Sequence, residues 1–414
     1  MTVKLAVIGA GARGQIYARA AAADGRSRIV AVADPDPARR DALAREHGLP
    51  EQARFTGWEE LAAVPRLADA VVIATQDRLH AGPAVAFAGL GYAVLLEKPM
   101  APTEPEARRI VEAVERAGVV FALAHVMRYT AYTRAFKQLV DGGRLGAISS
   151  VQHLEPVGWW HMAHSFVRGN WRNTAQSGPM LLTKSCHDLD WLLHLLGDEP
   201  IGVASFGSLT HFRPESRPPG AGSRCVSCAV EPACPYSAKR LYLGCLGDPE
   251  REFWPLGPVT SDATTAGVMR ALEEGPYGRC VYTCDNDVVD QQVVMLEFAG
   301  GTTASFTMTA FTPLEHRKTR VFGTHGFAEG DGRSIRIVDF TTGTEERIDT
   351  ATRAGASLAD GHGGGDAGLI KAFIDAVEAG DQAPLGAAPA EALAGHLVVW
   401  AAERARTSRT VQAL

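Results

Sequence analysis

The first 125 residues repeat one pattern, in which short and almost wholly apolar runs alternate with segments of helical periodicity. The runs fall at residues 4–8, 28–33, 70–74, 93–96 and 119–123. Strands this apolar need cover on both faces, and helices between them supply it, as in a parallel sheet. The sequence therefore predicts a doubly wound parallel α/β domain of the Rossmann type over residues 1–125.

A different pattern follows, because β-rich segments now arrive without helices between them. They lie near residues 148–154, 203–209, 293–298, 302–309, 317–322 and 334–340. Helices are expected over residues 128–142, 181–196, 366–378 and 389–406. Consecutive strands of this kind predict an antiparallel or mixed sheet. Residues 126–414 are thus expected to form an α+β domain with a large open, mainly antiparallel sheet.

The charge balance and the apolar runs exclude several classes of partner. The 414 residues carry 41 Lys and Arg against 47 Asp and Glu, a net charge of −6. We therefore expect no nucleic-acid partner. No run reaches the roughly 18–20 consecutive apolar residues of a membrane helix, and the N-terminus lacks the pattern of a signal peptide. We expect a cytoplasmic protein with no membrane partner.

The segment from about residue 210 to 284 reads as an insertion rich in Pro, Gly and Cys, and it holds six of the seven cysteines. A Cys-x2-Cys pair with further thiols is the spacing of a structural zinc site. We expect the ligands to be Cys225, Cys228, Cys234 and Cys280, with Cys245 and Cys284 as alternatives for the fourth. An iron–sulfur cluster, or a set of free buried thiols, would fit the same spacing.

A G-x-G-x-x-G motif follows the first apolar run and opens a helix. Its residues are Gly9, Gly11, Ala12, Arg13 and Gly14. In this strand–turn–helix context, the glycines allow a tight turn and close approach of the backbone to a pyrophosphate at the helix N-terminus. The motif predicts a dinucleotide site.

Asp34 ends the second apolar run, about 20 residues after the glycines. An acidic residue at this place binds the hydroxyls of the adenosine ribose and repels a 2′-phosphate. We therefore expect NAD in preference to NADP. Arg39 and Arg40 could bind a phosphate, but the helix expected from residue 35 should turn them to solvent.

Glu97-Lys98-Pro99 closes the run at residues 93–96, at the carboxyl edge of the expected sheet, where such sheets bind ligands. Together with the glycine motif, Thr75-Gln76 and the downstream His187, it resembles the Gfo/Idh/MocA family, which includes glucose–fructose oxidoreductase and inositol dehydrogenase. The resemblance covers nearly the whole chain apart from the cysteine-rich insertion.

The resemblance implies roles for particular residues. In that family the Lys of Glu-Lys-Pro hydrogen-bonds the reacting hydroxyl, and a His on a helix of the second domain takes its proton while hydride passes to nicotinamide. Lys98 and His187 would hold those catalytic roles. The expected cofactor site further includes Thr75, Gln76, His80, Glu97, Lys98, Trp171 and Arg172. The expected substrate site includes Lys98, Arg128, Trp160, His164, Lys184, His187 and Asp188, with Asp285–Asp287 and His362 as further polar candidates.

The chain departs from the family at one place. The usual Asp-x-x-x-His becomes Thr183-Lys184-Ser185-Cys186-His187, so the Asp that assists the His is absent. Asp188 follows directly, but neighbours on a helix diverge by about 100° and need not share a site. Lys184 would be either a second cation near the substrate or a surface lysine.

These features lead to one expected function and two alternatives. We expect an NAD-dependent oxidoreductase acting reversibly on a secondary hydroxyl of a sugar, glycoside, aminosugar or cyclitol. A redox-neutral NAD-dependent glycosidase, which oxidises the sugar transiently, would use the same residues. A catalytically silent NAD-binding regulator would require an impaired site, and both Lys98 and His187 are present. An exposed second-domain sheet would favour a homodimer or homotetramer.

Overall fold

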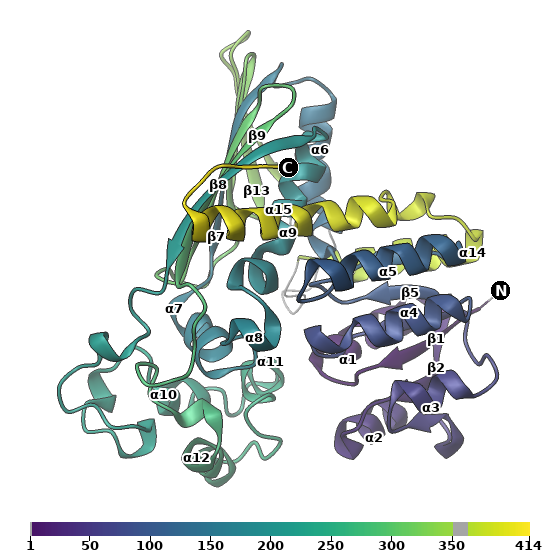
Figure 1. The fold of residues 1–414 in the computed structure, drawn as a ribbon, viewed down its shortest axis with the longest axis vertical. Coiled ribbons are helices and arrows are strands. Elements are labelled where there is room, and N and C mark those ends of the chain that lie inside the picture. Colours follow the sequence, from purple (N-terminus) through teal and green to yellow (C-terminus); the bar gives the residue numbers. More distant parts are fainter. Residues whose placement is uncertain (1, 351–362) are drawn as a thin grey trace. The chain divides into compact units, whose positions relative to one another are not determined.

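The chain divides into two compact units, each with its own sheet (Figure 1). The computed structural model describes residues 2–350 and 363–414. The first unit comprises Met1–Arg144, Leu189–Gly197 and the described part of Ile348–Trp400. The second comprises Leu145–Asp188, Asp198–Arg347 and Ala401–Leu414.

The first unit is built on a six-stranded parallel sheet with strand order β3-β2-β1-β4-β5-β6. The strands are β1 (Val3–Ile8), β2 (Ser27–Ala33), β3 (Arg54–Phe55), β4 (Ala70–Ile73), β5 (Ala93–Leu96) and β6 (Phe121–Leu123). The helices between them are α1 (Ala12–Asp24), α2 (Pro37–Glu46), α3 (Trp58–Ala63), α4 (Ala81–Gly89) and α5 (Glu104–Ala117). The predicted doubly wound sheet is confirmed. Its order changes direction beside β1, where sheets of this kind bind their ligands.

One helix from near the end of the sequence belongs to this first unit. α14 (Gly365–Ala379) packs against α1, and its Leu369, Ile370 and Phe373 are buried in the same apolar core as Leu5 and Val7 of β1. By its packing, α14 belongs to the first unit, although it lies within the stretch 126–414 expected to form the second domain.

The second unit contains a nine-stranded sheet with order β14-β13-β12-β11-β7-β10-β9-β8-β15. The strands are β7 (Ile148–Pro156), β8 (Pro200–Ser208), β9 (Gln291–Phe298), β10 (Thr303–Thr309), β11 (Lys318–Gly323), β12 (Gly326–Gly330), β13 (Ser334–Asp339), β14 (Glu345–Asp349) and β15 (Gln412–Ala413). The pair β7–β10 is parallel, whereas β8–β9, β9–β10 and β7–β11 are antiparallel. The sheet is therefore mixed and mainly antiparallel, as predicted.

The cysteine-rich insertion connects β8 to β9 and forms short helices: α10 (Ala238–Leu243), α11 (Pro249–Arg251) and α12 (Thr265–Glu274). It has its own small apolar core, to which Cys225, Tyr242, Cys245, Leu256 and Leu272 belong. A long segment with little periodicity is thus organised by local packing.

The two longest helices among the described residues are α9 (Met180–Leu196) and α15 (Pro389–Ser408). The segment Ala383–Ser408 is long and apolar enough to cross a membrane by length and composition alone, with a mean hydropathy of 1.2. However, 56% of its most apolar window is buried inside the protein, as in an ordinary core helix.

Candidate functional site

The turn after β1 packs too tightly for a side chain at two of its glycines and leaves open space at a third. Gly9 has a φ of +93°, and a Cβ there would lie 2.5 Å from the Ala74 carbonyl oxygen. A Cβ on Gly14 would lie 1.9 Å from the Gly9 carbonyl oxygen, whereas one on Gly11 would meet nothing within 4 Å. Gly11 caps α1 without a side-chain acceptor for the first N–H groups. Open space beside bare helix N–H groups fits the pyrophosphate of a dinucleotide.

Asp34 lies beside this turn, immediately after β2. Its carboxylate accepts hydrogen bonds from the N–H groups of Ala10 (2.6 Å) and Asp36 (2.8 Å). Each oxygen retains a lone pair for a ribose hydroxyl, because a carboxylate can accept about four hydrogen bonds. Arg39 is exposed, as expected, but Arg40 is partly buried and donates to the Asp34 carbonyl oxygen (3.0 Å). The expectation that Arg40 points to solvent is therefore wrong.

The loop after β4 contributes Thr75, Gln76 and His80. The Thr75 hydroxyl is buried and has no hydrogen-bond partner in the described part of the chain. Gln76 is exposed. His80 is fully buried, with its ring nitrogens 2.8 Å from the Pro99 carbonyl oxygen and 3.1 Å from that of Thr75. Thr75 thus fits a cofactor contact, whereas His80 ties this loop to the loop that follows β5.

Glu97, directly after β5, is the centre of a buried hydrogen-bond cluster. It binds the Arg13 guanidinium and accepts a hydrogen bond from the Tyr17 hydroxyl (2.8 Å). The Lys98 N–H donates to its other oxygen (2.6 Å). Burial alone would raise the pKa of Glu97, but Arg13 and Lys98 lower it below its usual range. Glu97 therefore stays ionised and fixes the backbone of Lys98.

Arg13, expected in the cofactor site, forms ion pairs within the first unit. Its guanidinium binds Asp366 on α14 (2.5 Å) as well as Glu97, and it lies over the Tyr17 ring, 4.6 Å from the centroid. Both carboxylates pair with its guanidinium. Sequence reasoning missed Tyr17 and Asp366, since nothing in the sequence pairs residues 13 and 366.

Arg128 also forms an ion pair within the first unit. Its guanidinium forms two hydrogen bonds with Asp190 (2.8 and 2.6 Å), whose carboxylate lies 2.8 Å from the His125 ring as well. Burial would raise the pKa of Asp190, but His125 and Arg128 hold it well below its usual range. We expected Arg128 to bind substrate, and the structure instead assigns it to a buried ion pair.

His187 lies on α9 beside a row of paired charges in the second unit. Lys184 binds Glu155 (3.0 Å), and Glu155 binds Arg317 (3.0 Å). Arg317 binds Asp188 (2.5 Å), which also lies 3.2 Å from the His153 ring. The side chain of Lys184 is only 16% exposed, so it is not a surface lysine.

Asp188 was expected in the substrate site, but the structure pairs its carboxylate with neighbouring side chains. It is fully buried, and its carboxylate is taken by Arg317 and His153 rather than offered to a substrate. Burial would raise the pKa of Asp188, but Arg317 and His153 hold it well below its usual range. Thr183, at the place of the family's Asp, donates to the carbonyl oxygen of Pro179, the residue before α9 (3.4 Å).

The aromatic segment before α9 packs against the insertion. Trp160 contacts Trp254, with ring centroids 5.3 Å apart, and the His164 ring lies 2.8 Å from the Tyr242 hydroxyl. Burial, together with Arg168, lowers the pKa of His164 to about 3. His164 is therefore a neutral core residue and not the expected substrate contact.

The side chains of Trp171 and Arg172 likewise contact other residues of the protein. The Trp171 ring stacks on Phe166 with centroids 5.9 Å apart, and Arg172 binds Asp285 (2.9 Å). These contacts do not support the expected cofactor role of Arg172. His362 lies outside the described residues.

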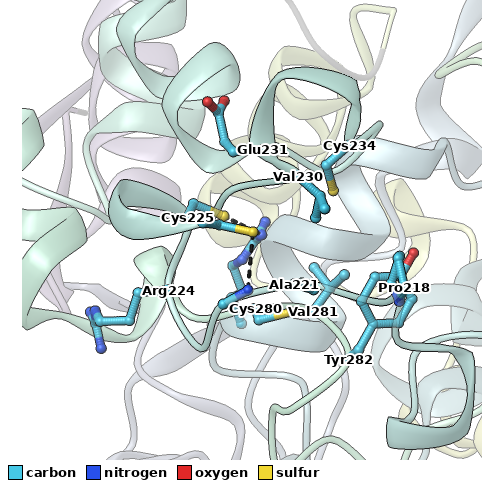
Figure 2. Close-up of a pocket in the computed structure, with 13 residues that line it drawn as sticks. Pro218, Ala221, Arg224, Cys225, Val230, Glu231, Cys234, Cys280, Val281 and Tyr282 are labelled. Carbon is cyan, nitrogen blue, oxygen red and sulfur yellow. Dashed lines mark hydrogen bonds between the residues drawn. The ribbon is translucent and has the colours of Figure 1, made fainter.

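The four cysteines expected to bind metal are Cys225, Cys228, Cys234 and Cys280. They line one small cavity inside the insertion (Figure 2). None of the seven cysteines, all of which lie among the described residues, forms a disulfide.

Comparison with known proteins agrees with this description. The oxidoreductase-family model for an NAD-binding Rossmann fold, GFO_IDH_MocA, matches residues 3–125, and the model for the family's C-terminal alpha/beta domain matches residues 137–412. The fold and site thus define an NAD-binding oxidoreductase. The chain belongs to the Gfo/Idh/MocA family.

Several relatives share parts of the chain. YteT of Bacillus subtilis (strain 168) is 26% identical over 313 residues, which are 73% of this chain and 70% of YteT. Inositol 2-dehydrogenase of Rhizobium meliloti (strain 1021) is 28% identical over 50% of this chain and 58% of its own. The 1,5-anhydro-D-fructose reductase of Ensifer adhaerens is 32% identical over 42% of this chain and 50% of its own. The chain thus spans only about half the length of these last two relatives.

Solved structures share the fold. One is an oxidoreductase from Agrobacterium radiobacter in complex with NAD+, L-tartaric acid and magnesium, at 15% identity and a TM-score of 0.73, covering 100% of this chain and 98% of that one. Another is an oxidoreductase domain protein from Kribbella flavida, at 18% identity and a TM-score of 0.73, covering 100% and 99%. At this identity the likeness shows the fold alone.

Proposed function

We propose that the protein transfers hydride between NAD and a secondary hydroxyl of a sugar, glycoside, aminosugar or cyclitol. The observation that carries this is the pairing of a glycine turn with a lysine held at a strand end: Gly11 leaves open space at the N-terminus of α1 for a dinucleotide, and Glu97 fixes the backbone of Lys98. Relatives named inositol 2-dehydrogenase and 1,5-anhydro-D-fructose reductase support a polyhydroxylated substrate.

Lys98 and His187 divide the chemistry of the hydroxyl group in this proposal. NAD, when bound, accepts the hydride from the carbon at its nicotinamide ring. The Lys98 ammonium stabilises the negative charge that develops on the substrate oxygen, and the His187 imidazole takes the hydroxyl proton. Removing that proton while hydride leaves turns the alcohol into a ketone.

The test is the absorbance of NADH at 340 nm with a panel of cyclic polyols, glycosides and aminosugars. Net NADH formation with one of them, and the ketone as its product, is the expected result. The glycosidase alternative gives the opposite pattern: release of the aglycone without a net absorbance change, and solvent deuterium entering beside the oxidised carbon. That pattern would overturn the dehydrogenase proposal.

We also propose that the protein resides in the cytoplasm. None of its seven cysteines, all among the described residues, forms a disulfide, as is usual in a reducing compartment. Fractionation of the source cells, with an antibody to the full chain, tests this location.

A further inference from the structure

Three cysteines from the start of the insertion and a fourth from its end line one cavity. It has a volume of about 20 Å³, which is enough for a single water-sized particle. Cys225 and Cys228 flank a single 3-10 turn, and Cys234 follows the next such turn. Cys280 arrives from the other end of the insertion, where its N–H donates to the Ser223 carbonyl oxygen (2.9 Å). Backbone pairing therefore fixes which later cysteine joins the first three.

The two other cysteines of the insertion have different surroundings. The Cys245 thiol lies in the apolar core and donates to the Leu241 carbonyl oxygen (3.2 Å). The Cys284 thiol donates to the Cys280 carbonyl oxygen (3.3 Å). Neither lines the cavity. The structure thus selects four of the six thiols.

A buried cation also lines this cavity. Arg168 is 1% exposed, and its guanidinium donates to the carbonyl oxygens of Arg279 and Tyr236 (both 2.8 Å) and lies 3.5 Å from the Cys225 sulfur. Its third nitrogen, Nη1, is buried and has no hydrogen-bond partner among the described residues. Neutral carbonyls solvate a guanidinium but do not balance its charge.

No carboxylate of the described chain forms an ion pair with Arg168. The one carboxylate that lines the cavity, Glu231, binds Lys239 (3.3 Å) instead. A buried charge is strongly unfavourable unless an opposite charge accompanies it. The cavity therefore requires an anion, and the groups around it that can supply one are the four thiols.

We propose that Cys225, Cys228, Cys234 and Cys280 bind one structural Zn²⁺ as thiolates. The proposal goes beyond hydride transfer and does not depend on it. Zn²⁺ with four thiolates carries a net charge of −2, which supplies the anion that Arg168 needs. Binding releases the thiol protons to solvent and involves no change of oxidation state.

Two donors already point at sulfur atoms of this set. Besides the Arg168 contact with Cys225, the Gly222 N–H donates to the Cys228 sulfur (3.2 Å). The four sulfur atoms are not yet close enough to share one ion: among the described residues, no three of them lie within 4.8 Å of one another. Zn–S bonds of about 2.3 Å would draw them inward and join the two ends of the insertion.

The test measures metal in the full-length protein, purified under reducing conditions without added metal. Elemental analysis should find about one zinc per chain. Cys228→Ser and Cys234→Ser should each lose most of it, while the matched control Cys284→Ser, whose thiol lies outside the cavity, should retain it. Exchange for Co²⁺ should give the intense visible bands and the near-ultraviolet charge-transfer band of a tetrahedral thiolate site.

A second measurement covers variants that fail to fold. Stepwise modification of the wild-type thiols with a mercurial should release zinc as four equivalents react with the site. A wild-type protein that contains no zinc and takes up neither Zn²⁺ nor Co²⁺ would overturn the proposal. Equal loss of zinc in Cys284→Ser would also overturn it, as would iron and sulfide in place of zinc.

Discussion

At the scale of single residues, Asp34 is the group that should set the choice of cofactor. Its carboxylate is fixed by two backbone N–H groups beside the glycine turn, where a 2′-phosphate would meet a negative charge. We predict that the wild-type protein binds NADH more tightly than NADPH. Asp34→Ala should lower the affinity for NADH about 10-fold or more, because hydrogen bonds to a charged group contribute about 1.5–3 kcal/mol.

Titration by nicotinamide fluorescence measures both affinities. Arg39→Ala is the matched control, since Arg39 is exposed and pairs only with the helix cap Asp36 among the described residues. It should leave both affinities unchanged. Equal or tighter binding of NADPH by the wild type would contradict the prediction, and would point to Arg40, which lies at the Asp34 carbonyl.

Lys98 and His187 carry the second prediction at this scale. Lys98→Ala and His187→Ala should each reduce kcat by about 10² to 10⁴, as expected for the loss of a charge-stabilising group or a general base. NADH affinity should stay within a few-fold of the wild type, because neither change touches the glycine turn. Turnover near the wild-type rate in either variant would remove that residue from the mechanism.

At the scale of elements, the Asp188–Arg317 pair holds α9 to the sheet of the second unit. We predict that Asp188→Ala lowers the free energy of unfolding by about 3–5 kcal/mol, because it leaves the charge of Arg317 buried with one partner fewer. Urea unfolding at pH 7 measures this. Glu329→Ala is the control: it breaks an exposed pair with Arg320 on β11 and should cost no more than about 1 kcal/mol.

The buried His164 makes stability depend on pH. Its pKa is lowered to about 3 in the folded chain, whereas an unfolded histidine has a pKa of about 6.5. Between these values the unfolded chain binds more protons, so stability is complete above pH 6.5 and declines as the pH falls. Between pH 7 and pH 5, this histidine should lower the free energy of unfolding of the wild type by about 2 kcal/mol. His164→Gln should remove that part of the decline in urea unfolding, and parallel profiles would contradict the prediction.

The strands and helices were predicted from sequence far better than the contacts between them. Apolar runs of four to six residues located β1, β2, β4, β5 and β6, because full burial on both faces leaves that pattern. The two-residue strand β3 left no such pattern and was missed. The helices α10 and α12 were missed as well, because they lie within a segment dominated by Pro, Gly and Cys.

The candidate site was predictable only where a motif has a local cause. The glycine turn and Asp34 lie together because the chain returns through a single helix and strand. The pairs Arg13–Asp366 and Arg128–Asp190 depend instead on which distant elements pack together. Arg13 and Arg128 were therefore read as free to bind ligands, although buried carboxylates hold both.

At the scale of the whole molecule, the outer face of the nine-stranded sheet supports a homo-oligomer. Phe206 on β8 and Met295 on β9 are 64% and 57% exposed. Phe206 pairs with Val293, two residues before Met295, so both side chains stand on one face of the sheet. Exposed apolar side chains grouped on a sheet face are typical of surfaces that bind another protein.

We therefore predict that the full-length protein is a homodimer or homotetramer in solution, and that Phe206→Glu dissociates it to monomers by placing a charge on the sheet face. Size-exclusion chromatography with light scattering measures the mass, and circular dichroism confirms that the variant is folded. Leu90→Glu is the matched control, because Leu90 is 48% exposed but follows α4 in the first unit. A monomeric wild type, or an unchanged mass for Phe206→Glu, would show that this face does not bind a second copy.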